Sequence, residues 1–255
     1  MICRTIIITS IVIFVSTVAS IAQSLTADEI IDKVIEIMNQ QYVKATMTMT
    51  IMTSSGKQRT FVYETFSKDK GEKNLIKYIS PGRVKDQATL MLNHADDIWA
   101  YFPRTNRVRK LATHAKKQKM EGSDFSYEDM GSGDAWSTDF EVRLLADDKI
   151  EGVACYVLNL VKKPDTESGY SRQVIWVRQD NFFPIQIDYY DEDDPDYKLK
   201  RLSLLDIREI EDVPTAMKLV MHNLQDNSET IMEYQDVTYA EELPDDIFTE
   251  RGMKK

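Results

Sequence analysis

The chain has 255 residues, and its 32 basic and 42 acidic side chains give a formal net charge of -10 at pH 7. This global acidity argues against a general nucleic-acid-binding role, which needs a basic surface. The two cysteines are Cys3 and Cys155. Removal of an N-terminal leader would leave only Cys155, so we expect no intramolecular disulfide and a fold stabilised by a packed core.

The first 22 residues have the pattern of a secretory signal peptide. Arg4 precedes an uncharged stretch from 5 to 21 that is rich in Ile and Val, and small residues occur at Ser20 and Ala22. We expect cleavage after Ala22 and delivery to the periplasm. The mature chain is expected to carry no lipid, because Cys3 precedes the apolar run. An uncleaved anchor is the alternative, since the run is near the minimum spanning length of about 17 residues.

Residues 23 to 255 are predicted to form one domain, because all-β barrels commonly reach about 200 to 250 residues. Residues 26–29 predict a helix N-cap with an acidic first turn, and apolar residues follow at helical spacing as far as Met38. From Tyr42 the apolar residues alternate with polar ones, which predicts a strand that ends at a turn over residues 54–57.

Further strands are predicted at hairpin-like spacing, separated by turns that contain Gly, Pro or Asp. One clear helix among many strands favours a sandwich or barrel over alternating α/β units, and we expect a strongly bent sheet wrapped over the helix. Residues 116 to 134 break the alternation and are predicted to be loop or short helices. The predicted strands are 59–67, 74–79, 88–92, 98–102, 107–111, 140–146, 154–162, 170–178, 185–190, 199–210, 216–224 and 230–239.

The sequence contains no G-x-S-x-G nucleophile elbow, no Walker loop and no Cys-x-x-Cys pair. His94, His114 and His222 are too far apart for a local metal signature. Cys155 lies in a strand-like run, where a thiol packs as a small hydrophobe. We therefore expect no catalytic residue, no metal and no cofactor. The acidic run 191–196 is interpreted as a solvated hairpin tip, with a cation site as the less favoured alternative.

A basic run without acidic residues extends from 104 to 119 on this acidic chain. Such a patch can attract phosphates or an anionic docking partner. One alternative is a solvated sheet edge protected by its charges. Another is internal pairing with the carboxylates that follow at 124, 128 and 129. The candidate docking residues are Arg104, Arg107, Arg109, Lys110, Lys116, Lys117 and Lys119.

Methionine and aromatic residues recur on the predicted strands. Methionine adapts its shape to irregular apolar ligands, and a fully packed core uses the same residue types, so both interpretations stay open. Trp99 and Tyr101 share one face of their strand, and Phe102 lies on the other face. The candidate cavity residues are Met47, Met49, Phe61, Tyr63, Trp99, Tyr101 and Phe102.

The strand-like residues 99–103, the basic run and the block Gly122-Ser123-Asp124-Phe125-Ser126-Tyr127-Glu128-Asp129 follow one another along the chain. Together with residues 181–185, 214–217 and 243–249, they resemble bacterial envelope proteins of the outer-membrane lipoprotein-sorting-like family, relatives of the LolA- and LolB-like periplasmic lipoprotein carriers. The resemblance implies an incomplete, strongly curved antiparallel β-barrel of about 11 strands, with helices over its open side and an apolar interior.

The resemblance also implies a noncatalytic carrier that shields the acyl chains of a lipid or lipoprotein in an apolar cavity within the periplasm. Expected partners are those acyl chains, a transiently contacted membrane and an inner-membrane transporter or permease, but no nucleic acid. The alternative is an envelope interaction or sensor domain that docks on a permease or regulator.

The octapeptide block is a candidate lid. We expect Ser123, Asp124, Tyr127 and Asp129 to tie a loop across the barrel mouth through side-chain hydrogen bonds. The full set of motif residues is Gly122, Ser123, Asp124, Phe125, Tyr127, Glu128 and Asp129.

Overall fold

The computed structural model describes residues 25–131 and 135–255, so the expected signal peptide at residues 1–22 lies outside the described residues. One antiparallel sheet of 14 strands dominates the described chain. Three short helices accompany it: α1 (Ala27–Met38), α2 (Tyr127–Gly131) and α3 (Ala135–Asp139). The expected fold class, an incomplete curved barrel with helices, is confirmed, with 14 strands in place of about 11.

The sheet is a meander in which almost every strand pairs with its neighbour in sequence, and the long-range pair β1 with β14 joins the two halves. Each predicted strand is present to within three residues at its ends, and the short β8 was not predicted. The strands are β1 (Tyr42–Met52), β2 (Gln58–Lys68), β3 (Lys73–Ser80), β4 (Ala88–Leu92), β5 (Asp97–Phe102), β6 (Arg107–Lys110), β7 (Phe140–Leu144), β8 (Asp148–Ile150), β9 (Val153–Lys162), β10 (Tyr170–Arg178), β11 (Pro184–Asp191), β12 (Lys198–Ile210), β13 (Val213–Asn223) and β14 (Ser228–Thr238).

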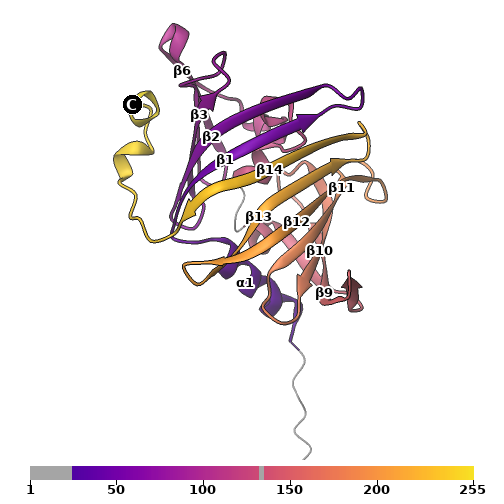
Figure 1. Ribbon diagram of the computed structural model, residues 1–255. Coiled ribbons are helices and arrows are strands. Elements are labelled where there is room, and N and C mark those ends of the chain that lie inside the picture. The colour runs from indigo at the N-terminus through magenta and orange to yellow at the C-terminus, as the bar shows by residue number, and fades with distance from the viewer. Residues whose placement is uncertain (1–24, 132–134) are drawn as a thin grey trace, which may run out of the picture.

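The sheet does not close on itself. Its strand order, β6-β5-β4-β3-β2-β1-β14-β13-β12-β11-β10-β9-β7, leaves β6 and β7 as two edges that are not paired with each other. Figure 1 shows the strong curvature of the sheet, with α1 beneath one end of it. Helix α1 packs against the edge strand β7 and against α3, so it covers part of the open side.

Helix α1 begins where the sequence predicts. The Thr26 backbone N–H donates to the Glu29 carboxylate (2.8 Å) and the Glu29 N–H donates to the Thr26 hydroxyl (3.2 Å), which is a capping box. Ile30, Ile31 and Val34 are buried, because their spacing places them on one helix face. That face joins the main core inside the curved sheet.

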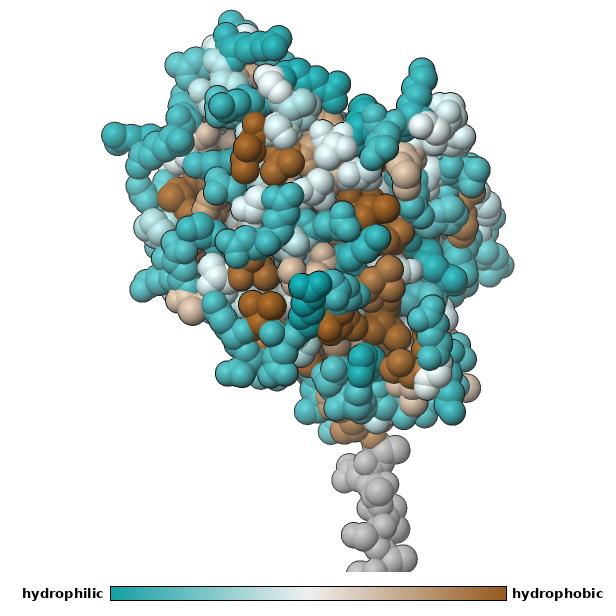
Figure 2. All heavy atoms as spheres, in the orientation of Figure 1, coloured by the Kyte–Doolittle hydropathy of each residue, from teal (hydrophilic) through white to brown (hydrophobic). Residues whose placement is uncertain are grey.

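The main core gathers inward-facing side chains from both halves of the sheet. Met47 lies opposite Tyr63 and Met49 lies opposite Phe61 in the β1–β2 pairing, so these four side chains share one face. The face of the molecule that Figure 2 shows is mainly hydrophilic, with scattered apolar groups and one band of apolar residues toward the lower right. The alternation of β1 therefore separates core from solvent, as its sequence predicts.

A second apolar cluster lies on the outer face of the first half of the sheet. Leu243, Phe248 and Met253 of the C-terminal segment are buried there against Leu75 and Leu90. The segment includes the short 3-10 helices η4 (Asp245–Ile247) and η5 (Gly252–Lys254), seen at the end of the chain in Figure 1. The C-terminal segment thus covers an apolar patch that β3 and β4 would otherwise expose.

One buried and one exposed phenylalanine test this assignment of residues to the core. Phe61 is 0% exposed, so Phe61→Ala should lower the free energy of unfolding by about 3 to 5 kcal/mol, through lost burial and a residual cavity. Phe102 is 37% exposed, and Phe102→Ala should cost less than about 1 kcal/mol. Urea denaturation of both variants measures the difference, and equal losses would contradict the assignment.

Candidate functional site

The chain between β6 and β7 has to cross the open side of the barrel, because these consecutive strands lie at opposite ends of the strand order. Residues 111–131 of this connection are called the crossing segment below. It includes the 3-10 helices η2 (Thr113–Lys117) and η3 (Met120–Gly122), and α2. Met120 and Phe125 of the crossing segment are buried in the main core, and the Gly122 carbonyl accepts a hydrogen bond from Arg59 of β2 (3.3 Å).

Asp124 attaches the crossing segment to the start of β14. Its carboxylate accepts hydrogen bonds from the hydroxyls of Ser228 (2.6 Å) and Thr230 (2.8 Å), and its backbone N–H donates to the Thr230 hydroxyl (2.9 Å). Both Asp124 and Thr230 are buried. Since a buried carboxylate is costly without donors, these contacts stabilise the crossing segment in its place against β14.

Asp129 forms a second attachment, to β12. Its carboxylate lies 2.5 Å from the ammonium nitrogen of Lys200, and the two side chains are only 2% and 5% exposed. The same carboxylate accepts from the Tyr170 hydroxyl (2.8 Å), while Lys200 also donates to the Asp124 carbonyl (3.0 Å). The ammonium group lies 5.0 Å from the ring centre of Tyr170 and 5.1 Å from that of Tyr189. Every charge of this buried cluster therefore has a partner.

Glu128 forms a third attachment, to the start of β10. Its carboxylate accepts hydrogen bonds from the Ser168 hydroxyl and from the Gly169 N–H (2.8 Å). Burial raises the pKa of Glu128 above its ordinary value, while the two hydrogen bonds oppose that rise. The three attachments tie the crossing segment to strands β10, β12 and β14 of the second half of the sheet.

The other residues of the candidate lid make contacts within the crossing segment or with the main core. Ser126 and Asp129 cap α2 reciprocally, through Ser126 N–H to the Asp129 carboxylate (2.6 Å) and Asp129 N–H to the Ser126 hydroxyl (3.1 Å). The Ser123 hydroxyl bonds to the backbone of Phe125, and Tyr127 packs against the main core. Of the four residues expected to tie the loop, Asp124 and Asp129 therefore reach across to the sheet through their side chains.

Four of the seven candidate cavity residues lie together in the interior that the crossing segment covers. Met47, Met49, Phe61 and Tyr63 are all buried in the main core. The Tyr63 hydroxyl donates to the sulfur of Met232 (3.4 Å), and burial raises the pKa of Tyr63 far above its ordinary value. The interior is thus apolar and rich in methionine, and side chains occupy it.

The structure does not bring the other three cavity candidates to this interior. Trp99 and Tyr101 pack in the outer cluster, on the opposite face of the sheet. Phe102 lies at the margin of the sheet, where it lines a surface pocket of about 290 Å³. Pairing of Trp99 with Leu90 in the neighbouring strand fixes this orientation. The sequence shows which residues of a strand share a face, but it does not show which of the two faces the rest of the chain covers.

The seven candidate docking residues divide into two groups. Four lysines form ion pairs, Lys110 with Asp97, Lys116 with Asp96, Lys117 with Glu192 and Lys119 with Asp226. Lys116 is buried although it belongs to the basic run. The three arginines, Arg104, Arg107 and Arg109, lie exposed on the hairpin between β5 and β6. Internal pairing thus uses the four lysines of the run and leaves its three arginines exposed.

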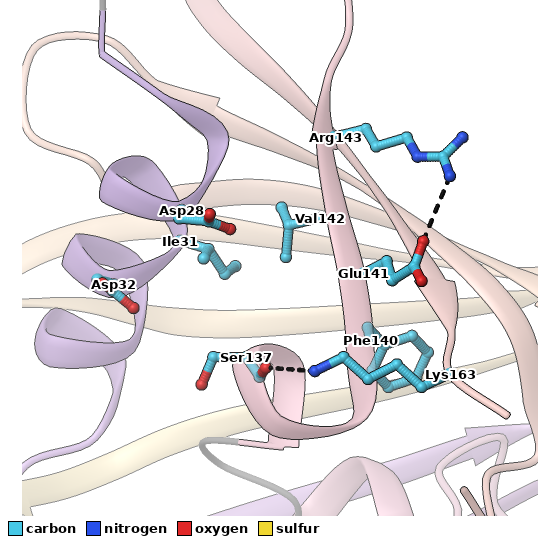
Figure 3. A pocket seen from close by; sticks show the side chains of 9 residues that line it. All are labelled: Asp28, Ile31, Asp32, Ser137, Phe140, Glu141, Val142, Arg143 and Lys163. Atoms are coloured by element: carbon cyan, nitrogen blue, oxygen red, sulfur yellow. Dashed lines mark hydrogen bonds and ion pairs between the residues drawn. The ribbon is translucent and has the colours of Figure 1, made fainter. Parts of the chain in front are cut away.

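A larger surface pocket, of about 480 Å³, lies between α1 and the edge strand β7. Figure 3 shows Asp28, Ile31 and Asp32 on the helix side of this pocket, facing residues of β7. Lys163 donates to the Ser137 carbonyl (3.1 Å) at its rim. Its charged walls differ from the apolar interior, and none of the seven candidate cavity residues lines it.

Sequence reasoning missed the partners of the motif, which are Ser168, Tyr170, Lys200, Ser228 and Thr230. One signal was present for Lys200, because it occupies the inward position of a strand whose next inward residues are Leu202 and Leu204. A lysine on the apolar face of a strand needs a buried counter-charge. The identity of that counter-charge, Asp129, depends on a contact between residues 71 positions apart.

Comparisons with known proteins identify the fold. A family model described as "Uncharacterized protein" matches residues 70–255, most of the chain, so the chain belongs to that family. An outer membrane lipoprotein-sorting protein domain from Vibrio parahaemolyticus is 25% identical, with a TM-score of 0.79 over 88% of this chain and 97% of that one. A DUF1329 family protein from Desulfovibrio piger is also 25% identical, with a TM-score of 0.79 over 90% and 100%.

A LolA superfamily protein from Nitrosomonas europaea is 23% identical, with a TM-score of 0.75 over 89% of this chain and 98% of that one. The resemblance to the lipoprotein-sorting-like family is therefore confirmed, and the fold is LolA-like. No curated protein matches the chain. Among the helices formed by residues 25–131 and 135–255, none is long and apolar enough to cross a membrane.

Removal of the Lys200 charge tests the buried ion pair. Lys200→Met should lower the free energy of unfolding by about 3 to 5 kcal/mol, because Asp129 stays buried without its cation. Adding Asp129→Asn should recover part of the loss, which a double-mutant cycle in urea measures. Lys44→Met is the control, since its pair with Glu241 is exposed and should contribute at most about 1 kcal/mol. Strict additivity of the two losses would argue against coupling.

The raised pKa of Glu128 predicts a pH dependence. Because the folded protein binds this proton more tightly than the unfolded chain, the resulting stabilisation is fully present below the ordinary pKa, about 4.5, and is lost as pH rises through the raised value. Glu128→Gln should remove this contribution, so the stability of the variant relative to wild type should increase with pH. Unfolding free energies from pH 4 to 8, with exposed Glu72→Gln as control, measure it. A pH-independent difference would contradict the assignment.

Proposed function

We propose that this member of the LolA-like family is a noncatalytic periplasmic carrier that shields the acyl chains of a lipid or lipoprotein. The observation that carries the proposal is the apolar, methionine-rich interior closed by a segment that polar contacts hold in place. In this proposal the structure corresponds to the closed state. Acyl chains enter when the crossing segment moves away from β12 and β14 and the interior side chains rearrange.

The composition of the interior supports this rearrangement. Met47, Met49, Met221 and Met232 are buried in the main core, on strands β1, β13 and β14. Methionine is unbranched and polarizable, so it can adopt other rotamers around a ligand at low cost. Phe61 and Tyr63 supply large apolar surfaces beside them. Such a lining suits flexible acyl chains better than a ligand with fixed polar groups.

The magnitudes are compatible with reversible opening. Burial of about ten methylenes contributes about 8 kcal/mol. Leaving the buried Lys200 ammonium without its partner costs about 3 to 5 kcal/mol, and loss of hydrogen bonds to a charged group costs about 1.5 to 3 kcal/mol each. The gain from one acyl chain is thus similar to the cost of releasing the attachments at Asp124 and Asp129. A carrier needs this balance, because it must both take up and release its cargo.

The first test is native mass spectrometry, with lipid extraction, of the mature protein purified from a bacterial periplasm without detergent. The expected result is a bound phospholipid or acylated peptide, either on purification or after incubation with lipid vesicles. An unchanged apo mass in both samples would overturn the carrier proposal.

Weakening the Asp124 attachment should accelerate ligand exchange. Asp124→Ala removes two hydroxyl-to-carboxylate hydrogen bonds, so the open state becomes more populated and a fluorescent fatty acid should enter at least tenfold faster. The matched control is Asp180→Ala, which removes an aspartate from the exposed pair with Arg178 in the β10–β11 turn. Stopped-flow fluorescence measures the rate. An unchanged uptake rate together with unchanged stability would exclude a lid role for Asp124.

The second candidate is an envelope interaction or sensor domain, in which the crossing segment stays closed. The dense filling of the interior by Met49, Phe61 and Tyr63 favours it, since all three are fully buried. This candidate predicts no extractable lipid and binding to a permease or regulator in the envelope. The vesicle arm of the mass-spectrometry experiment separates it from the carrier.

A further inference from the structure

On the β5–β6 hairpin, the paired and the unpaired charges of the basic run lie on different faces. Lys110 lies on one face, where it pairs with Asp97 and lies 5.1 Å from the ring centre of Trp99. Arg107 and Arg109 are on the opposite face, because side chains alternate along β6. Arg104 belongs to the connecting 3-10 helix η1 (Pro103–Thr105). Among the described residues, no acidic side chain forms an ion pair with these three arginines.

An exposed aromatic ring accompanies the unpaired arginines. Phe102 lies directly opposite Arg107 in the β5–β6 pairing, and Ala100, two residues earlier, lies opposite Arg109. Phe102, Arg107 and Arg109 therefore share one face of the hairpin, with the Arg109 guanidinium 6.0 Å from the Phe102 ring centre. Phe102 is an exposed large hydrophobic residue of the described chain. The hairpin thus presents cationic and apolar groups side by side at a free sheet edge.

A shallow pocket lies at this tip. It has a volume of about 290 Å³, and its lining combines two arginines with two neutral polar side chains and two apolar ones. Arg104 and Arg109 can each donate two parallel hydrogen bonds to an oxyanion such as a phosphate. The lining residues are Gln87, Phe102, Pro103, Arg104, Thr105 and Arg109.

We propose that the β5–β6 hairpin tip is a docking site for the surface of an anionic phospholipid bilayer, with the arginines on lipid phosphates and Phe102 at the headgroup boundary. Charge complementarity carries this choice, because three uncompensated arginines cluster on a chain whose formal net charge is -10. The net acidic charge of the chain is repelled by the same bilayer, so a local cluster of uncompensated arginines is needed for a favourable approach. The exposed Phe102 favours a bilayer over an acidic protein segment, since an interface accepts an apolar ring beside cations.

This inference rests on the proposed carrier function and deepens it, because it specifies which end of the barrel meets a donor or acceptor membrane. The hairpin precedes the crossing segment directly in the chain, from Lys110 to Leu111. Docking would therefore place the membrane next to the start of the segment that must move. Surface docking and acyl uptake are nevertheless separate measurements.

The test is co-sedimentation of the mature protein with vesicles of phosphatidylglycerol and phosphatidylethanolamine, or of phosphatidylcholine alone, at low and high salt. Binding is expected only to the anionic vesicles, and it should weaken with salt because the contacts are exposed. The triple variant Arg104→Gln, Arg107→Gln, Arg109→Gln should bind on the order of a hundredfold more weakly. Lys70→Gln, Lys149→Gln, Lys254→Gln together form the control, which makes the same change in net charge at exposed positions elsewhere.

Wild-type binding to neutral and anionic vesicles alike, absence of binding to both, or equal losses in the two triple variants would overturn the docking proposal. Thermal unfolding of each variant confirms that exposed substitutions leave the fold intact. A protein that docks through the arginines but contains no lipid by native mass spectrometry would support the docking site and contradict the carrier function. Uptake of lipid with no arginine-dependent docking would support the carrier function and contradict the docking site.

Discussion

The constraint on which the rest of the structure depends is the failure of the sheet to close. Strands β6 and β7 are its two edges, yet they follow one another in the chain. The intervening polypeptide therefore has to cross the opening, whatever its sequence. Because that crossing covers an apolar interior, its own apolar side chains, such as Met120 and Phe125, can be buried, and its polar groups need partners on the inner surface of the sheet.

These partners are supplied by a polar cluster at the boundary of the core. Asp124 and Asp129 are paired with hydroxyls of β14 and β10 and with the ammonium group of Lys200. Such buried pairs contribute little net stability compared with an apolar replacement, but a broken pair is expensive. The arrangement therefore specifies one position of the crossing segment strongly, although its net contribution to stability is modest.

The lysines and the arginines of the basic run have different environments. Its lysines pair with Asp96, Asp97, Glu192 and Asp226 and help to fix the crossing segment and its surroundings. Its arginines remain on the hairpin tip without an acidic partner among the described residues. One basic run in the sequence thus supplies both lysines that form ion pairs within the protein and arginines that stay exposed on its surface. Within β6, strand alternation makes this division, because Lys110 lies on the face opposite to Arg107 and Arg109.

The sequence by itself determined the elements of this protein, because alternation, capping residues and turn residues act locally. Local patterns predicted helix α1 through Thr26 and Glu29, the meander of strands, and the break in alternation that the described residues 116–131 show. Family resemblance added the open barrel and the motif. Only the tertiary structure decided that Trp99 and Tyr101 face the C-terminal segment while Met47 and Tyr63 face the core, and that Lys200 meets Asp129. These outcomes depend on contacts between residues far apart in the chain, which no local pattern encodes.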